Sequence, residues 1–286
     1  MIICTHNGNF HADELFAISL ILKVVGPCEI IRSRDPKDWA RADFLVDVGG
    51  QYDGKKKFDH HQHQPDLPQH EDGTPFSSFG MVYHHFKQAI LEEYCEQLEL
   101  ASDRDQFFAV VDDHLIRRLV KPVDAWDNGY PGATCPNIAD ILSSTYNAVW
   151  WEKSVPEDTY FFSALRLAQE YLDSVFKAGI GKYLAQLMSP AIEREDGIMV
   201  LPIYFPYQDY VAPEDKFCVL PSKEGKWNLL TIPVQKKNRD IPRQEIPSAW
   251  LEHPPHGAIF VHKARFIAVF ETKEQALAAA KQALAL

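Results

Sequence analysis

The sequence predicts an α/β protein: a first domain with a parallel sheet, and a smaller strand-rich α/β domain, joined by helices. Three observations indicate this. The chain has 286 residues, which is more than one typical core needs. Short apolar strands alternate with a long helix within the first 50 residues, which is typical of a parallel sheet. After Gly197 the pattern changes to several short strands followed by one closing helix.

The individual elements follow from the lengths of the apolar runs. In the first half, short runs predict strands at 1–5, 28–32 and 44–48. Longer runs predict helices at 12–25, 78–98, 104–120 and 158–188. We expect an interruption of the last helix near Gly179–Gly181, because glycine weakens a helix.

In the second half, further short runs predict strands at 198–204, 217–220, 227–234, 259–262 and 266–270. Thr272 and Gln275 have the spacing of a capping box, which predicts a final helix at 273–285. The expected regions are therefore a first domain at 1–155, a connecting helical region at 156–194 and a second domain at 195–286.

Charge and histidine are both unevenly distributed along the chain. The 29 Lys and Arg and 40 Asp and Glu give a net charge of −11, which argues against a generic nucleic-acid coat protein. From Glu195 onward there are 11 basic and 11 acidic residues, so the whole excess of negative charge lies before that point. Eight of the 12 histidines precede residue 86. Acid and histidine concentrated in one half are typical of a metal site.

The five cysteines are scattered, and none forms a CxxC pair. This pattern argues against a disulfide framework and favours reduced thiols. The N-terminus has no secretory pattern, and no apolar run reaches 18 residues. We therefore expect a cytoplasmic protein that does not cross a membrane.

The first candidate site motif is Thr5-His6-Asn7-Gly8-Asn9-Phe10-His11-Ala12-Asp13-Glu14, where the first strand passes into the first helix. In an open α/β sheet this is the carboxyl end of a strand, the usual place for a site. His6, His11 and Asp13 are potential metal ligands within eight residues. The alternative is that Asp13 only caps the helix and the histidines are surface residues.

Two further motifs lie later in the first half of the chain. Asp47 ends the apolar run at 44–48, and a carboxylate there is costly to bury unless it is paired or binds metal. Asp59 precedes the pair His60 and His61. On an extended backbone, adjacent side chains point to opposite sides, so the two histidines can take different roles. Asp59 is placed to orient an imidazole. The alternatives are a turn aspartate and a polar loop.

A fourth motif, Asp124-Ala125-Trp126-Asp127-Asn128-Gly129, ends a predicted helix. Asp127 could reach back to the other candidates, or the segment could simply close the helix. The order of the four motifs, together with SSFGMVYHHF and the later Trp227, Arg243 and Phe260-Val261-His262, resembles the DHH phosphoesterase superfamily. Within it, the chain is similar to the melanocyte-proliferating-gene-1 protein family of metal-dependent hydrolases, over nearly its whole length.

This resemblance implies a DHH-type metal-binding catalytic domain that holds two divalent ions, with Mn²⁺ preferred. Mixed imidazole and carboxylate ligands suit Mn²⁺ without excluding Mg²⁺, Fe²⁺ or Zn²⁺. One ion would be held by His6, His11 and Asp47, and the other by Asp13, Asp47, His60 and Asp127. His61 would donate to a phosphate oxygen, with Asp59 beside it.

The resemblance also implies that the second domain binds the substrate through Arg243, His262, Lys263 and Arg265. Relatives commonly carry a Gly-Gly pair after the last strand turn, whereas this chain has no glycine at 264–269. In the absence of these glycines, Lys263 and Arg265 would bind the phosphates.

The implied function is a Mn²⁺-dependent phosphodiesterase that acts on a nucleotide or on short single-stranded RNA or DNA, as a 3′–5′ exonuclease. The alternatives are a pyrophosphatase-like phosphoanhydride hydrolase and a non-catalytic regulatory protein that binds metal or nucleotide. The sequence leaves the oligomeric state open, with a homodimer among the alternatives.

Overall fold

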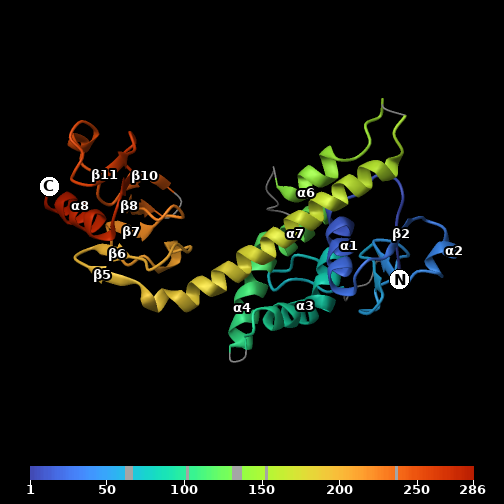
Figure 1. Ribbon diagram of the computed structural model, residues 1–286. Helices are drawn as coiled ribbons and strands as arrows, with labels where there is room; N and C mark the ends of the chain where they lie inside the picture. Colours follow the sequence, from blue (N-terminus) through green and yellow to red (C-terminus); the bar gives the residue numbers. More distant parts are fainter. Residues whose placement is uncertain (62–66, 101–102, 131–136, 152–153, 236–237) are drawn as a thin grey trace. The chain divides into compact units, whose positions relative to one another are not determined.

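The computed structural model describes residues 1–61, 67–100, 103–130, 137–151, 154–235 and 238–286. It is a mixed α/β structure with one parallel and one mixed sheet, as Figure 1 shows. The chain divides into two compact units, Met1–Ile180 and Gly181–Leu286. Their border lies inside the segment 156–194 that was expected to connect two domains.

The first unit is built on a four-stranded sheet in the order β2-β1-β3-β4. All three pairings are parallel, as the alternation of strands and helices predicted. The strands are β1 (Ile2–Thr5), β2 (Glu29–Arg32), β3 (Phe44–Val46) and β4 (Lys57–Phe58). β3 is two residues shorter than expected, because Asp47 has a φ of 55° and leaves the extended conformation. The two-residue β4 has no periodicity to reveal it.

The helices of this unit are α1 (Ala12–Val25), α2 (Pro36–Trp39), α3 (Ser78–Gln97), α4 (Arg104–Leu115), α5 (Lys121–Asp127), α6 (Ile138–Asp140) and the start of α7 (Glu157–Met188). π-helical segments at 116–120 and 141–145 follow α4 and α6. The buried helix α1 packs along α3, visible as blue beside teal in Figure 1.

The expected interruption near Gly179–Gly181 is wrong, because α7 runs through both glycines. A Cβ on Gly179 would lie 3.3 Å from side-chain atoms of Val111 and His114. This glycine therefore allows α4 and α7 to approach each other closely, and that packing offsets its low helix propensity.

The second unit contains a six-stranded sheet in the order β11-β12-β8-β7-β6-β5, in which only β6 and β7 pair in parallel. Its strands are β5 (Glu193–Glu195), β6 (Ile198–Val200), β7 (Phe217–Pro221), β8 (Trp227–Thr231), β11 (Ala258–Val261) and β12 (Ile267–Phe270). A separate two-stranded antiparallel sheet pairs β9 (Pro233–Gln235) with β10 (Asn238–Pro242). Short 3-10 turns lie at Ser189–Ala191, Gln208–Tyr210 and Ser248–Leu251.

The closing helix α8 (Lys273–Ala285) begins at the expected capping box. The Gln275 amide donates to Thr272 Oγ1 at 3.3 Å, and the Thr272 amide donates to Gln275 Oε1 at 3.2 Å. The alanines of α8 pack on the sheet with Phe217, Leu229 and Phe270. Of the cysteines, Cys4, Cys28, Cys95 and Cys218 are free thiols, and Cys135 lies outside the described residues. Within the described residues, no helix is both long and apolar enough to cross a membrane.

Candidate functional site

The candidate residues of the first half meet at one edge of the parallel sheet. The loop after β1, the turn after β3 and the segment after β4 all lie at the carboxyl ends of parallel strands, where sites in such sheets form. A pocket of about 990 Å³ opens there and is lined by residues that include His6, His11, Asp47, Asp59 and His61. Asp127, at the end of α5, reaches the same cluster.

Asp47 is the centre of this cluster. Its side chain is 1% exposed, and its carboxylate lies 3.3 Å from His6 Nε2, 3.4 Å from His60 Nε2 and 3.3 Å from His61 Nδ1. Ser78 Oγ, from the start of α3, donates to Asp47 Oδ1 at 3.0 Å. Burial acts to raise the pKa of Asp47, but the contacts with the three histidines outweigh it and hold that pKa well below its usual range. Asp47 therefore remains an anion that can be shared between two cations.

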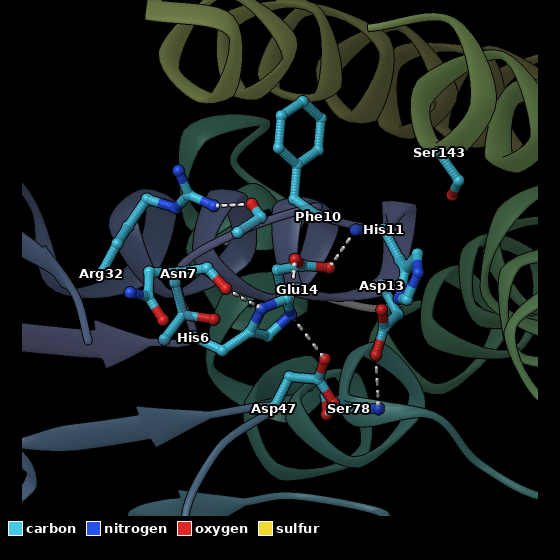
Figure 2. Close-up of polar contacts among 12 residues, drawn as sticks. His6, Asn7, Phe10, His11, Asp13, Glu14, Arg32, Asp47, Ser78 and Ser143 are labelled. Carbon is cyan, nitrogen blue, oxygen red and sulfur yellow. Dashed lines mark hydrogen bonds and ion pairs between the residues drawn. The ribbon is translucent and has the colours of Figure 1, made fainter. Parts of the chain in front are cut away.

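Glu14 is a member of the site that the sequence did not reveal. It is fully buried in the first turn of α1, and its Oε1 lies 3.1 Å from His6 Nε2. Its other oxygen accepts a hydrogen bond from the His11 amide at 2.8 Å. Figure 2 shows His6 surrounded by Asn7, Glu14 and Asp47. The available signal was a second acidic residue directly after Asp13, in a position that also serves as a helix cap.

A second group forms around His60. Its Nε2 lies 3.0 Å from Asp127 Oδ2 and 3.9 Å from Asp13 Oδ2, and its Nδ1 lies 3.3 Å from Asn128 Oδ1. Burial and the nearby carboxylates of Asp127 and Asp47 raise the pKa of Asp13 well above its usual value. Asp127, at the end of α5, therefore lies within contact distance of this group. Asn128, which the sequence suggested only as a helix terminator, orients the His60 ring.

The expectation that His60 and His61 point to opposite sides is wrong. Their ring centroids are 4.4 Å apart, and both rings face Asp47 Oδ1. The cause is Asp59, whose Oδ1 accepts from the His61 amide at 2.9 Å and contacts the His61 ring at 3.0 Å. The two histidines differ instead in burial, since the His60 side chain is 8% exposed and that of His61 is 61% exposed.

His11 lies at the exposed edge of the cluster. Its side chain is half exposed, and its Nδ1 lies 3.7 Å from Asp127 Oδ1. Its ring centroid is 6.3 Å from that of His6. Among the described residues, three sets of ligand atoms lie close enough to hold an ion: Asp47, His60 and His61; His11, Asp13, Glu14 and Asp47; and Asp13, His60 and Asp127. His6 belongs to none of these sets, although it contacts both Glu14 and Asp47.

The chemistry of these atoms fits divalent ions. Asp13 Oδ1 is buried and makes no hydrogen bond in the structure. Glu14 Oε1, Asp47 Oδ2 and His60 Nε2 are also buried, and each meets another side chain of the cluster as an ion pair at 3.0–3.3 Å. Buried polar atoms normally have hydrogen-bond partners, and carboxylates crowded together repel one another. Cations placed among these atoms would coordinate the buried polar atoms and reduce the repulsion between the carboxylates. The mixture of imidazole and carboxylate is typical of transition-metal sites.

A buried network holds α5 in place beside the site. Asp124, three residues before Asp127, is fully buried and accepts from Ser77 Oγ at 2.6 Å and from the Gly80 amide at 3.0 Å. Its other oxygen lies 2.8 Å from His70 Nε2. This network ties α5 to the start of α3, which also carries the Asp47 partner Ser78.

Gly80 gives a test of that network. A Cβ on Gly80 would lie 2.3 Å from Asp124 Oδ2, so we expect Gly80→Ala to lower the free energy of unfolding by about 1–3 kcal/mol. The matched control is Gly181→Ala in α7, where a Cβ meets nothing within 4 Å and alanine should stabilise the helix by about 0.5–1 kcal/mol. Chemical denaturation of both variants and the wild type measures the free energy of unfolding. Equal free energies of unfolding for the two variants would contradict the tight packing of Gly80 against Asp124.

The four substrate-binding candidates lie in the second unit. Arg243 Nη1 donates to the carbonyls of Ala212, Pro213 and Asp215, and thereby holds that loop. Arg265 pairs with Glu245 at 2.7 Å. His262 Nδ1 accepts from the Ala264 amide at 3.0 Å, and Lys263 is exposed.

Arg265 has a φ of 55°, a conformation that favours glycine, at the turn where relatives were expected to carry a Gly-Gly pair. In this chain a residue with a side chain therefore occupies the left-handed position of the turn. The substrate-binding role of these four residues stays a prediction.

The sheet edge, the buried carboxylates and the histidines define an α/β protein with a cluster of side chains that could hold metal ions. The chain matches the MYG1 exonuclease family, described as uncharacterised protein family UPF0160, over residues 2–284, and it belongs to that family. The MYG1 protein YER156C of Saccharomyces cerevisiae is 29% identical over 99% of this chain and 95% of its own length. The human protein named MYG1 exonuclease is 28% identical over 99% of this chain and 85% of its own length.

Among solved structures, the pGpG-specific phosphodiesterase PggH of Vibrio cholerae aligns with 99% of this chain and 97% of its own. The TM-score is 0.30 and the identity 13%, which does not establish a shared fold.

Proposed function

We propose that this protein is a DHH-type phosphoesterase that uses two divalent ions, with Mn²⁺ preferred, to hydrolyse phosphodiester bonds. Its substrate is a nucleotide or short single-stranded RNA or DNA, and its polarity is 3′–5′. The observation that carries the proposal is the convergence of buried carboxylate and imidazole ligand atoms around Asp47 at the edge of an open pocket. Membership in a family whose human relative is named an exonuclease supports the nucleic-acid substrate.

The residues fall into two ligand groups that share Asp47. Asp13, His60 and Asp127 form the more buried group. We assign Glu14 to the other group with His6 and His11, because its carboxylate contacts His6 and its second oxygen fixes the His11 backbone. Two bound ions would activate a water for in-line attack on phosphorus and stabilise the charge on the phosphoryl oxygens.

His61 contributes through its exposed ring, which lines the pocket. Because Asp47 and Asp59 both contact Nδ1, the Nε2 side of the ring remains to donate to a non-bridging phosphate oxygen. The Asp59 carboxylate orients this ring and favours its protonated form, and Asp47 and Asp59 together raise the pKa of His61 to about 9. Arg243, His262, Lys263 and Arg265 are proposed to bind the rest of the substrate.

The direct test compares hydrolysis of a labelled single-stranded oligonucleotide with that of pyrophosphate, each with added Mn²⁺. Release of mononucleotides from the 3′ end supports the proposal, and blocking that end with a phosphorothioate linkage should stop it. Hydrolysis of pyrophosphate alone would indicate the phosphoanhydride hydrolase. Binding of metal without any turnover in a broad phosphoester screen would indicate a regulatory protein.

The histidines also predict how metal binding depends on pH. Burial lowers the pKa of His6, but Asp47 and Glu14 outweigh it and raise the pKa to about 10. In the same way, Asp127 and Asp47 overcome the burial of His60 and raise its pKa to about 10. An imidazole must lose its proton to bind a metal ion. We therefore expect Mn²⁺ affinity to rise by about tenfold per pH unit for each displaced proton, from pH 6.5 to 9.

Calorimetric titration of Mn²⁺ in two buffers of different ionisation enthalpy would count the released protons. The metal-free protein supplies a second readout. A raised histidine pKa stabilises the fold fully below the ordinary value of 6.5, and this contribution is lost as the pH rises towards 10. The metal-free protein should therefore lose stability over this range. An affinity that does not change with pH would show that no histidine proton is displaced.

A further inference from the structure

The pocket contains one fixed positive charge that the proposed ligand groups do not use. Among the described residues that line the pocket, Arg34 is the one lysine or arginine, and it stands among the acidic Asp47, Asp59 and Glu157. Arg34 lies two residues after the end of β2 and is exposed. Its position at the pocket wall is therefore set by the same sheet edge that sets the metal ligands.

The contrast with Arg32, on the same strand, shows which arginine is available to a ligand. The Arg32 side chain is 3% exposed, pairs with Asp158 at 2.9 Å, donates to the Gly8 carbonyl and lies over the Phe161 ring. Arg32 thus fastens the loop after β1 to α7, and Figure 2 shows it beside that loop. Arg34 has one weak contact in the described structure, from Nη2 to the Asn7 carbonyl at 3.5 Å. Most of its five N–H donors remain free.

That single contact places the guanidinium close to the reaction centre. The Asn7 carbonyl also lies 3.1 Å from His6 Nδ1, and His6 Nε2 lies 3.3 Å from Asp47. Arg34 and the His6 ring therefore share one carbonyl oxygen. In the described structure Arg34 contacts no proposed metal ligand directly and meets the site only through this carbonyl.

Trp39 lines the same pocket and supplies its large aromatic surface. Its Nε1 donates to the carbonyl of Ser33, the residue before Arg34, at 3.1 Å. The first unit has three other tryptophans, and none of them lines the pocket. Trp150 and Trp151 are exposed, and Trp126 is half-buried. A guanidinium and an indole in one pocket match the phosphate and the base of a nucleotide.

We propose that Arg34 binds a second phosphate of the substrate, adjacent to the scissile one, and so makes the enzyme prefer substrates with at least two phosphates. This inference rests on the proposed phosphodiesterase function. The planar fork of arginine suits bidentate binding of phosphate, which lysine cannot reproduce. Loss of one charge-assisted phosphate contact should lower kcat/KM by roughly 10- to 100-fold.

The test compares two substrates in the wild type, Arg34→Gln and Arg34→Lys. Bis(p-nitrophenyl) phosphate has a single phosphate, and a 5′-phosphorylated dinucleotide has two. We expect Arg34→Gln to lose roughly 10- to 100-fold in kcat/KM on the dinucleotide and little on the single phosphate, with Mn²⁺ affinity unchanged. Arg34→Lys should be intermediate. The matched control, Lys37→Gln, removes an exposed cation of α2 that does not line the pocket and should change neither activity.

Equal losses on both substrates, or no loss on either, would overturn the role of Arg34. Binding of the dinucleotide to the protein without added metal, measured by calorimetry, separates this inference from the proposed function. If the wild type cleaves neither substrate but binds the dinucleotide at least tenfold more tightly than Arg34→Gln does, the phosphate site stands and the phosphodiesterase proposal fails. If the two proteins bind the dinucleotide equally, the phosphate site fails.

Discussion

Replacing Asp47 by asparagine is expected to abolish phosphodiester hydrolysis, with a fall in kcat of more than about 100-fold. Loss of a residue that merely supports a metal ligand already costs about 10- to 100-fold, and Asp47 is proposed to be a ligand of both ions. Its carboxylate contacts His6, His60 and His61, so its removal affects both ligand groups at once. Metal stoichiometry, measured by elemental analysis after dialysis, should fall with the activity.

The choice of asparagine follows from the backbone. Asp47 has a φ of 55°, which asparagine tolerates far better than alanine does, so the variant tests the carboxylate and not the turn. Asp196 provides the matched control, because it has a φ of 51° and lies outside the pocket. Asp196→Asn should keep full activity and metal content. Unchanged hydrolysis in Asp47→Asn would remove the two-metal proposal.

The first half of the site was predictable because its ligands follow local sequence features. His6 and Asp47 each come directly after a short strand, and the carboxyl ends of parallel strands lie at the same edge of a sheet. The parallel sheet was also predictable from a local feature, namely the alternation of short strands with helices. The capping box of α8 was equally local, since Thr272 and Gln275 bond to each other.

Other features depend on how the loops fold around the site, which the sequence patterns did not indicate. Glu14 belongs to the site because the turn of α1 brings it beneath His6, and Asn128 because α5 packs against the segment after β4. The rotation of His61 towards Asp47 reverses the alternation of an ideal strand, since the Asp59 carboxylate holds the ring. No sequence pattern points to Arg34, because its position at the pocket wall depends on the folded sheet edge.

Single alanine substitutions of His60 and of His61 should produce two distinct defects. His60 is nearly buried, with carboxylates of Asp127 and Asp47 at one nitrogen and Asn128 at the other. We expect His60→Ala to lose bound metal and activity together, because a ligand of the more buried ion is missing. The nucleophile that this ion supplies would be lost with it.

His61→Ala should instead keep near-full metal occupancy, since its side chain is 61% exposed and faces the pocket. Removing one donor to the charge that develops on phosphate typically slows turnover by about 10²–10³-fold. His61→Gln, which restores a hydrogen-bond donor, should recover part of the rate. Both histidines lie close to the same oxygen of Asp47, so either ring could in principle bind an ion. Equal loss of metal in the two alanine variants would mean that His61 is a ligand as well.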